Sequence, residues 1–180
     1  IDNNSILIVG AMAVSPDLLP ITAIGVGIVA RRLGLAGRAL LTLAVGLGVA
    51  ALAAAMAAFV QDQLDLLPSD FNIEVSGALG GLTTVSNETI AVALVAGVAG
   101  MLALETRASS GVGVAISVTT IPAAAYLGVA AGLLETDEAL GALGVLGTNV
   151  SMMVVGAVAT LALQNLLMRR AVARRRSEPE

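Results

Sequence analysis

Residues 39–60 read ALLTLAVGLGVAALAAAMAAFV, an apolar run without a single charged side chain. A bilayer core of about 30 Å requires roughly 20 such residues in an α-helix. Similar runs recur along the chain, which predicts about five membrane-spanning helices. The predicted spans are residues 6–30, 39–60, 88–104, 111–134 and 138–167. The sequence therefore predicts an all-α integral membrane protein whose transmembrane domain covers residues 1–168.

The composition excludes several kinds of chemistry. Charged residues make up only 12% of the chain, against about 25% in an ordinary soluble domain. Cysteine, histidine and lysine are all absent, which removes thiol nucleophiles, imidazole bases and Schiff-base amines. We find no serine–base pair, paired aspartates or HExxH motif, so we expect no enzyme activity, no cofactor and no metal. With two Phe, one Tyr and no Trp, the chain lacks the aromatic side chains on which nucleic-acid bases stack.

The charged residues are segregated by position. All arginines fall on one side of a five-span zigzag: Arg31, Arg32, Arg38, Arg107, Arg169, Arg170, Arg174, Arg175 and Arg176. The connections on the other side, including an extracytoplasmic loop over 61–87, carry acidic residues and no basic residue. Positively charged loops stay in the cytoplasm. We therefore predict that the arginine-bearing loops and a disordered tail over 169–180 are cytoplasmic, with the acidic loops outside.

Two prolines and a carboxylate interrupt the first apolar run, in the sequence SPDLLP. Pro16 and Pro20 both remove backbone donors, which predicts a broken helix near the middle of the span. Broken backbone at membrane depth requires protein or water to satisfy its polar groups. Ser15, Asp17 and Thr22 could add side-chain ligands for an ion or small solute, and Asp17 could take up a proton or a cation. The alternative is a proline kink packed against a neighbouring helix.

A second group of polar residues lies in the fourth and fifth predicted spans. Pro122 predicts a break in the fourth span, and Thr119 and Thr120 lie just before it. Their hydroxyls could bind the same ion, or could bond back to carbonyls of their own helix. Asn149 could line the same cavity, or could serve as a hydrogen bond between helices.

The stretch that begins at Ser15 resembles the stretch that begins at Thr119. Each has a hydroxyl residue and a proline, a glycine-bearing apolar half, a charged turn and a second glycine-rich span. Spans one and two would then correspond to spans four and five in opposite orientation. Such inverted repeats are common in secondary transporters.

The chain also resembles a bacterial and archaeal membrane family known as domain of unknown function 389. The resemblance rests on DNNSILIVGAMAVSPDLLP (2–20), AGVAGMLALE (96–105), the proline segment 115–122 and LGTNV (146–150). It implies a multi-pass protein of the bacterial or archaeal plasma (inner) membrane, without an assigned reaction. The family pattern usually has an apolar residue at the position of Asp17, so the resemblance gives that carboxylate no general role.

These observations lead to two hypotheses of different kinds. The first is a small homodimeric transporter or channel in the lipid bilayer, with a midplane site for an ion or small solute between broken helices. The second is a non-transporting module for membrane anchoring, assembly or signalling. A polar cavity favours the first hypothesis, whereas a sealed, glycine-packed core favours the second.

Overall fold

The computed structural model describes residues 17–66, 82–106 and 109–177. Its helices are α2 (Leu18–Val29), α3 (Leu33–Gln63), α4 (Asn87–Thr106), α5 (Ser109–Gly132) and α6 (Thr136–Ser177). The described residues contain no strand, which confirms the all-α prediction. Within them, α3, α4 and α6 include segments long and apolar enough to cross a membrane. The apolar helix α2 has 12 residues, so its length is only about 18 Å.

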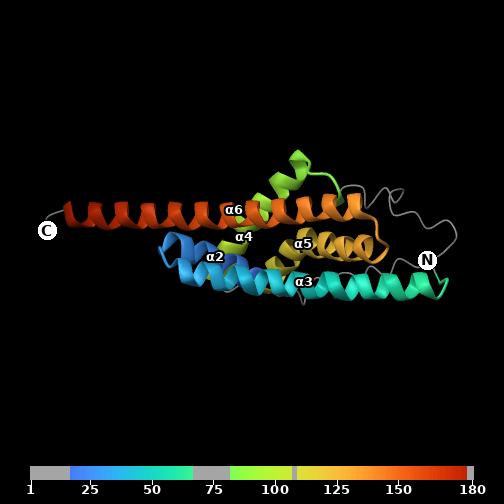
Figure 1. The fold of residues 1–180 in the computed structure, drawn as a ribbon. Helices are drawn as coiled ribbons and strands as arrows, with labels where there is room; N and C mark the ends of the chain where they lie inside the picture. Colours follow the sequence, from blue (N-terminus) through green and yellow to red (C-terminus); the bar gives the residue numbers. More distant parts are fainter. Residues whose placement is uncertain (1–16, 67–81, 107–108, 178–180) are drawn as a thin grey trace.

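Two helical hairpins, α2–α3 and α5–α6, form most of the described structure and run in opposite directions (Figure 1). The turn between α2 and α3 lies at one end of the bundle, and the turn between α5 and α6 lies towards the other. Each hairpin packs crosswise on the other, with α3 against α5 and α2 against α6. The helix α4 packs mainly on α6 and α5. The core is therefore built between the hairpins.

The two hairpins turn in the same way. The helices α2 and α5 each end at a residue with left-handed backbone, Arg31 at φ 55° and Leu134 at φ 63°. In each turn the N–H of the next residue donates to the carbonyl five positions earlier, at 2.7 and 2.9 Å respectively. This bond is typical of the Schellman ending of a helix. Corresponding residues in the two turns differ by 103 in number.

Small residues allow the helices to approach closely. A Cβ added at Gly97 of α4 would lie 2.7 Å from the Cα of Met153 in α6. A Cβ added at Gly128 of α5 would lie 2.8 Å from the Cβ of Ala54 in α3. Both distances are too short for real atoms, so only glycine fits at these crossings. Close backbone contact of this kind holds helices together where lipid, rather than water, surrounds them.

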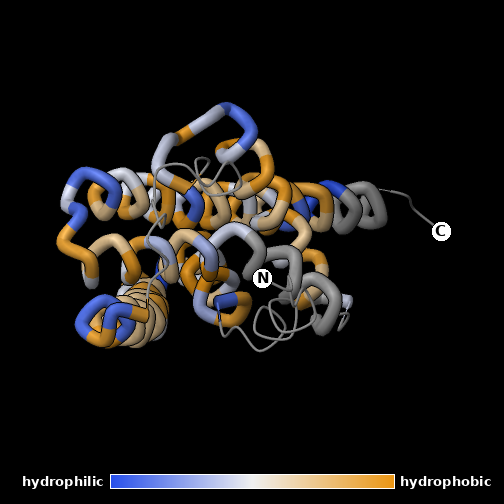
Figure 2. The backbone as a smooth tube through the Cα atoms, turned by 90° about the vertical axis from the view of Figure 1, so that its right-hand side faces the viewer, coloured by the Kyte–Doolittle hydropathy of each residue, from blue (hydrophilic) through white to orange (hydrophobic). Residues whose placement is uncertain are grey.

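The outer surface is apolar along the helices and polar near their ends. Figure 2 shows blue, hydrophilic segments mainly at turns and helix ends, and orange or pale colour along the helices. Large apolar side chains of α3 face outward, for example Leu41 at 65% and Leu52 at 62% exposure. Arg31 and Arg32 lie at the end of the bundle towards which α6 runs, and Asp62 lies near the opposite end (Figure 1). This surface suits burial in a bilayer.

The structure corrects two sequence-based predictions. The helix α5 continues through Pro122, so the predicted break in the fourth span is wrong. Neighbouring helices commonly allow a proline inside a membrane helix, because they compensate for the one missing hydrogen bond. The predicted disordered tail over 169–180 is wrong up to Ser177, where α6 ends. That segment is rich in arginine and alanine, which favour helix.

Candidate functional site

Four polar side chains are buried among the described residues, and the sequence analysis named all four. They are Asp17, Thr22, Thr120 and Asn149. Asp17 is 1% exposed and immediately precedes α2, where its carbonyl accepts a hydrogen bond from Ile21 N at 3.0 Å. The start of a short helix thus places a carboxylate in the protein interior.

Asp17 is joined directly to the second hairpin. The hydroxyl of Thr120, in the middle of α5, donates a hydrogen bond to Oδ2 of Asp17. The two residues are 103 positions apart, which is the same step that relates the two hairpin turns. Thr120 is itself fully buried. The two hairpins therefore meet at one carboxylate–hydroxyl pair formed by corresponding positions.

Asn149 makes the next polar contact, one residue away along α5. Its Nδ2 donates to the carbonyl oxygen of Thr119 at 2.8 Å, which ties α6 to α5. Its Oδ1 is buried and accepts no hydrogen bond. A buried amide oxygen without a donor is uncommon in native proteins. The polar contacts of Asn149 and of Asp17 therefore lie side by side on Thr119 and Thr120.

The other predicted site residues have different positions. The hydroxyl of Thr22 donates to carbonyls of its own helix, Leu18 O at 2.8 Å and Leu19 O at 3.0 Å. Thr22 thus follows the alternative considered for the threonines, a bond back to the helix. Pro20 lies in the first turn of α2, where a missing N–H costs little. Ser15 and Pro16 lie outside the described residues.

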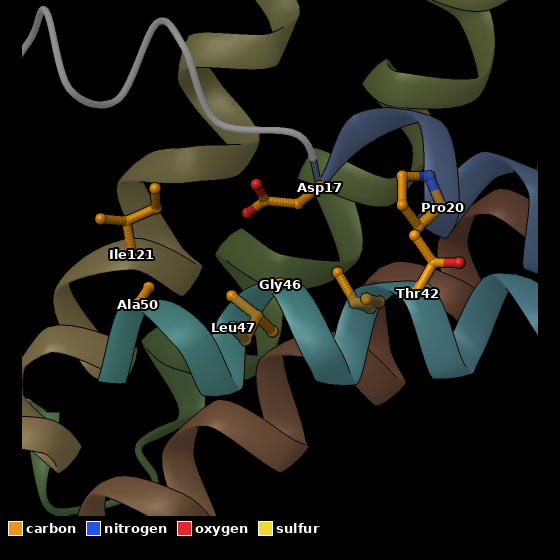
Figure 3. Close-up of a pocket in the computed structure, with 8 residues that line it drawn as sticks. Asp17, Pro20, Thr42, Gly46, Leu47, Ala50 and Ile121 are labelled. Atoms are coloured by element: carbon orange, nitrogen blue, oxygen red, sulfur yellow. The ribbon is translucent and has the colours of Figure 1, made fainter. Parts of the chain in front are cut away.

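A cavity of about 60 Å³ adjoins Asp17 (Figure 3). Asp17 and Pro20 border it from the start of α2, Gly46 and Leu47 from α3, and Ile121 from α5. Figure 3 shows the Asp17 carboxylate extending from the start of α2 towards α5, above α3. The sequence analysis missed the contribution of α3, since Gly46 lies in a uniformly apolar run. An alignment of the hairpins at a step of 103 residues would have matched Gly46 with Asn149.

The cavity presents one ionisable group in an apolar surround. Its other lining side chains are uncharged, and the hydroxyl of Thr42 among them donates to Arg38 O at 3.0 Å. No group of three His, Cys, Asp or Glu that could hold a metal ion occurs within the described part of the chain. The chemistry available from these residues is hydrogen bonding and the exchange of one proton.

Long apolar helices around a buried carboxylate place the chain in the class of helical proteins suited to a membrane. The chain belongs to the family described as Domain of unknown function (DUF389), whose model matches residues 12–155. The match includes Asp17, Thr120 and Asn149, and it confirms the family resemblance seen in the sequence motifs. No curated protein and no solved structure matches the chain.

Proposed function

We propose that the protein is a small transporter or channel that moves an ion or small solute across a membrane, through a site at Asp17 and Thr120. The observation that carries this proposal is the 1% exposed carboxylate at the contact between the two hairpins. A charged side chain at the centre of a bilayer costs about 2.5–3.5 kcal/mol on insertion scales. Such residues usually mark ion pathways, which favours transport over a purely anchoring role.

We interpret the two hairpins as an inverted repeat with a register of 103 residues. This register moves the earlier match of Ser15 with Thr119 by one position. It relates two close contacts between the hairpins, Gly25 beside Ala157 and Gly128 beside Ala54. Transporters with inverted repeats bind substrate at the interface between the repeats. Asp17 lies at that interface here.

A groove on the outer surface supports the same register. It has a volume of about 420 Å³ and lies between α3, α5 and α6. Most of its lining residues form pairs separated by 103 positions: Leu40 and Leu143, Leu43 and Leu146, Ala44 and Gly147, Leu47 and Val150, Gly48 and Ser151. We assign the contact between copies in the proposed homodimer to this apolar face, because a two-fold dimer uses one self-complementary patch. Light scattering of the purified protein in detergent tests it, and a monomeric mass would contradict it.

Flux through the purified protein in liposomes tests the proposed function. We expect the release of a proton, an alkali cation or a small anion to exceed that of protein-free liposomes, as followed with ion-sensitive dyes. The alternative, a membrane module for anchoring, assembly or signalling, predicts that every solute in such a panel leaks at the protein-free rate.

We also propose that the turn between α2 and α3 faces the cytoplasm and the turn between α5 and α6 faces outward, as the positive-inside rule favours. The chain has no cysteine, so single cysteines can be introduced at two exposed, uncharged positions, Ala30 and Thr136. In intact cells a membrane-impermeant maleimide should label Thr136→Cys at once. It should label Ala30→Cys only after the membrane is permeabilised. The reverse pattern would contradict the proposed orientation.

A further inference from the structure

The two hairpins differ at one pair of corresponding positions beside the buried carboxylate. In the second hairpin, Asn149 has a side chain that reaches the carbonyl of Thr119. The first hairpin has Gly46 at the corresponding position, 103 residues earlier. A Cβ added at Gly46 would meet nothing within 4 Å, and Gly46 borders the cavity next to Asp17. The cavity therefore occupies space that a side chain like that of Asn149 would fill.

The cavity is large enough for water but poorly equipped for a metal ion. A water molecule requires about 10–15 Å³ of such volume, so about 60 Å³ can accommodate more than one. A calcium ion takes about 6–8 oxygen ligands, and even magnesium takes six. Asp17 contributes the only charged side chain to the lining, and Thr42 contributes the only other polar side chain, with its proton donated to Arg38 O. The ligand that fits this lining is a proton carried by water.

We propose that the cavity beside Asp17 is a water pocket through which this carboxyl group takes up and releases a proton, and that Gly46 keeps the pocket open. This inference rests on the proposed function and specifies its ion. On release, the carboxyl O–H bond breaks and the proton passes to a water molecule, which leaves a carboxylate and a hydronium ion. On uptake the same steps run in reverse.

Thr120 can serve both forms of the carboxyl group. A hydroxyl has one donor and two acceptor lone pairs, and it rotates to suit its partner. It donates to Oδ2 when Asp17 is ionised, the arrangement seen here, and it can accept from the carboxyl O–H when Asp17 is protonated. Because no basic side chain lines the cavity, burial favours the neutral form and water must receive the proton when the charged form appears.

Infrared difference spectroscopy of the full-length protein in detergent tests this proposal. The carboxyl band of Asp17 is isolated as the difference between wild type and Asp17→Asn in mildly acidic buffer, and its shift is followed after transfer to D₂O. We expect Gly46→Leu to slow this exchange by about tenfold or more, because the pocket is filled and exchange then needs local opening of the helices. Gly46→Ala, a milder change on the same open side, should slow exchange less.

Gly37→Leu is the matched control. Gly37 also lies on α3 with nothing within 4 Å of an added Cβ, but it does not line the cavity, so its exchange rate should equal that of wild type. Wild-type exchange rates in both Gly46 variants, or the absence of an Asp17 carboxyl band, would overturn the proposal. Slowed exchange in Gly46→Leu supports the water pocket even if no flux is found in liposomes, a result that would reject only the transport function.

Discussion

Asp17→Asn is expected to reduce flux in liposomes by about tenfold or more, because the variant loses the one ionisable group at the contact between the hairpins. The change should leave the fold intact. An asparagine oxygen can still accept the hydrogen bond that the Thr120 hydroxyl donates to Asp17 in the native protein. The measurement is the initial rate of dye-reported flux at equal protein content, compared with wild type.

Variants at Thr120 separate loss of function from loss of structure. Thr120→Ser keeps the hydroxyl that donates to Asp17, so near-native flux and stability are expected. Thr120→Val leaves the buried Asp17 oxygen without this donor and should cost about 1–3 kcal/mol of stability. If Asp17→Asn transports at the wild-type rate while folding normally, Asp17 has no role in transport, and the site proposed here is incorrect.

Gly97→Ala is expected to cause the largest loss of stability of any single methyl group added here. The new Cβ would lie 2.7 Å from Met153 Cα, and backbone cannot move aside as the end of a flexible side chain can. Extra atoms in a well-packed core typically cost about 1–3 kcal/mol. For a chain of this size each kcal/mol lowers the midpoint of thermal unfolding by roughly 2–4 °C. Thermal unfolding of the purified protein in detergent measures the effect.

Gly144→Ala is the matched control for this prediction. It adds the same methyl group to α6, but at a position where a Cβ meets nothing within 4 Å. Since alanine favours helix over glycine by about 0.5–1 kcal/mol, this variant should be as stable as wild type or slightly more stable. Equal unfolding temperatures for the two variants would mean that α4 and α6 do not cross at Gly97.

The sequence predicted the helices well because the signal came from long runs of residues. Uncharged stretches of 20 or more residues have few alternatives to a helix in a membrane. Prediction failed where one residue had to outweigh its surroundings. Pro122 removes one hydrogen bond, but the rest of α5 keeps its helical bonds and its contacts with α3 and α6. The basic segment after Met168 was read as a disordered tail from its charge, although its alanines and arginines favour helix.

The polar part of the site could also be predicted, since a carboxylate or an amide in an apolar run is conspicuous. Asp17, Thr120 and Asn149 were all found in this way, and all are buried. Their pairing could not be predicted, because the repeat was aligned one residue out of register. Gly46 was missed for a different reason. A glycine that matters by leaving space has no side chain to attract attention, and only its counterpart Asn149 reveals the space.

The length of α6 gives motion at the site a distant effect. The helix is unbroken over 42 residues, or about 63 Å, which is twice the thickness of a bilayer core. About 42 Å of it lies beyond Asn149, on the side that ends at Ser177. If α6 pivoted as a rigid rod at Asn149 by about 10°, its far end would swing by about 7 Å. Whatever lies beside that end in the cell would therefore receive an amplified mechanical report of events at the buried carboxylate.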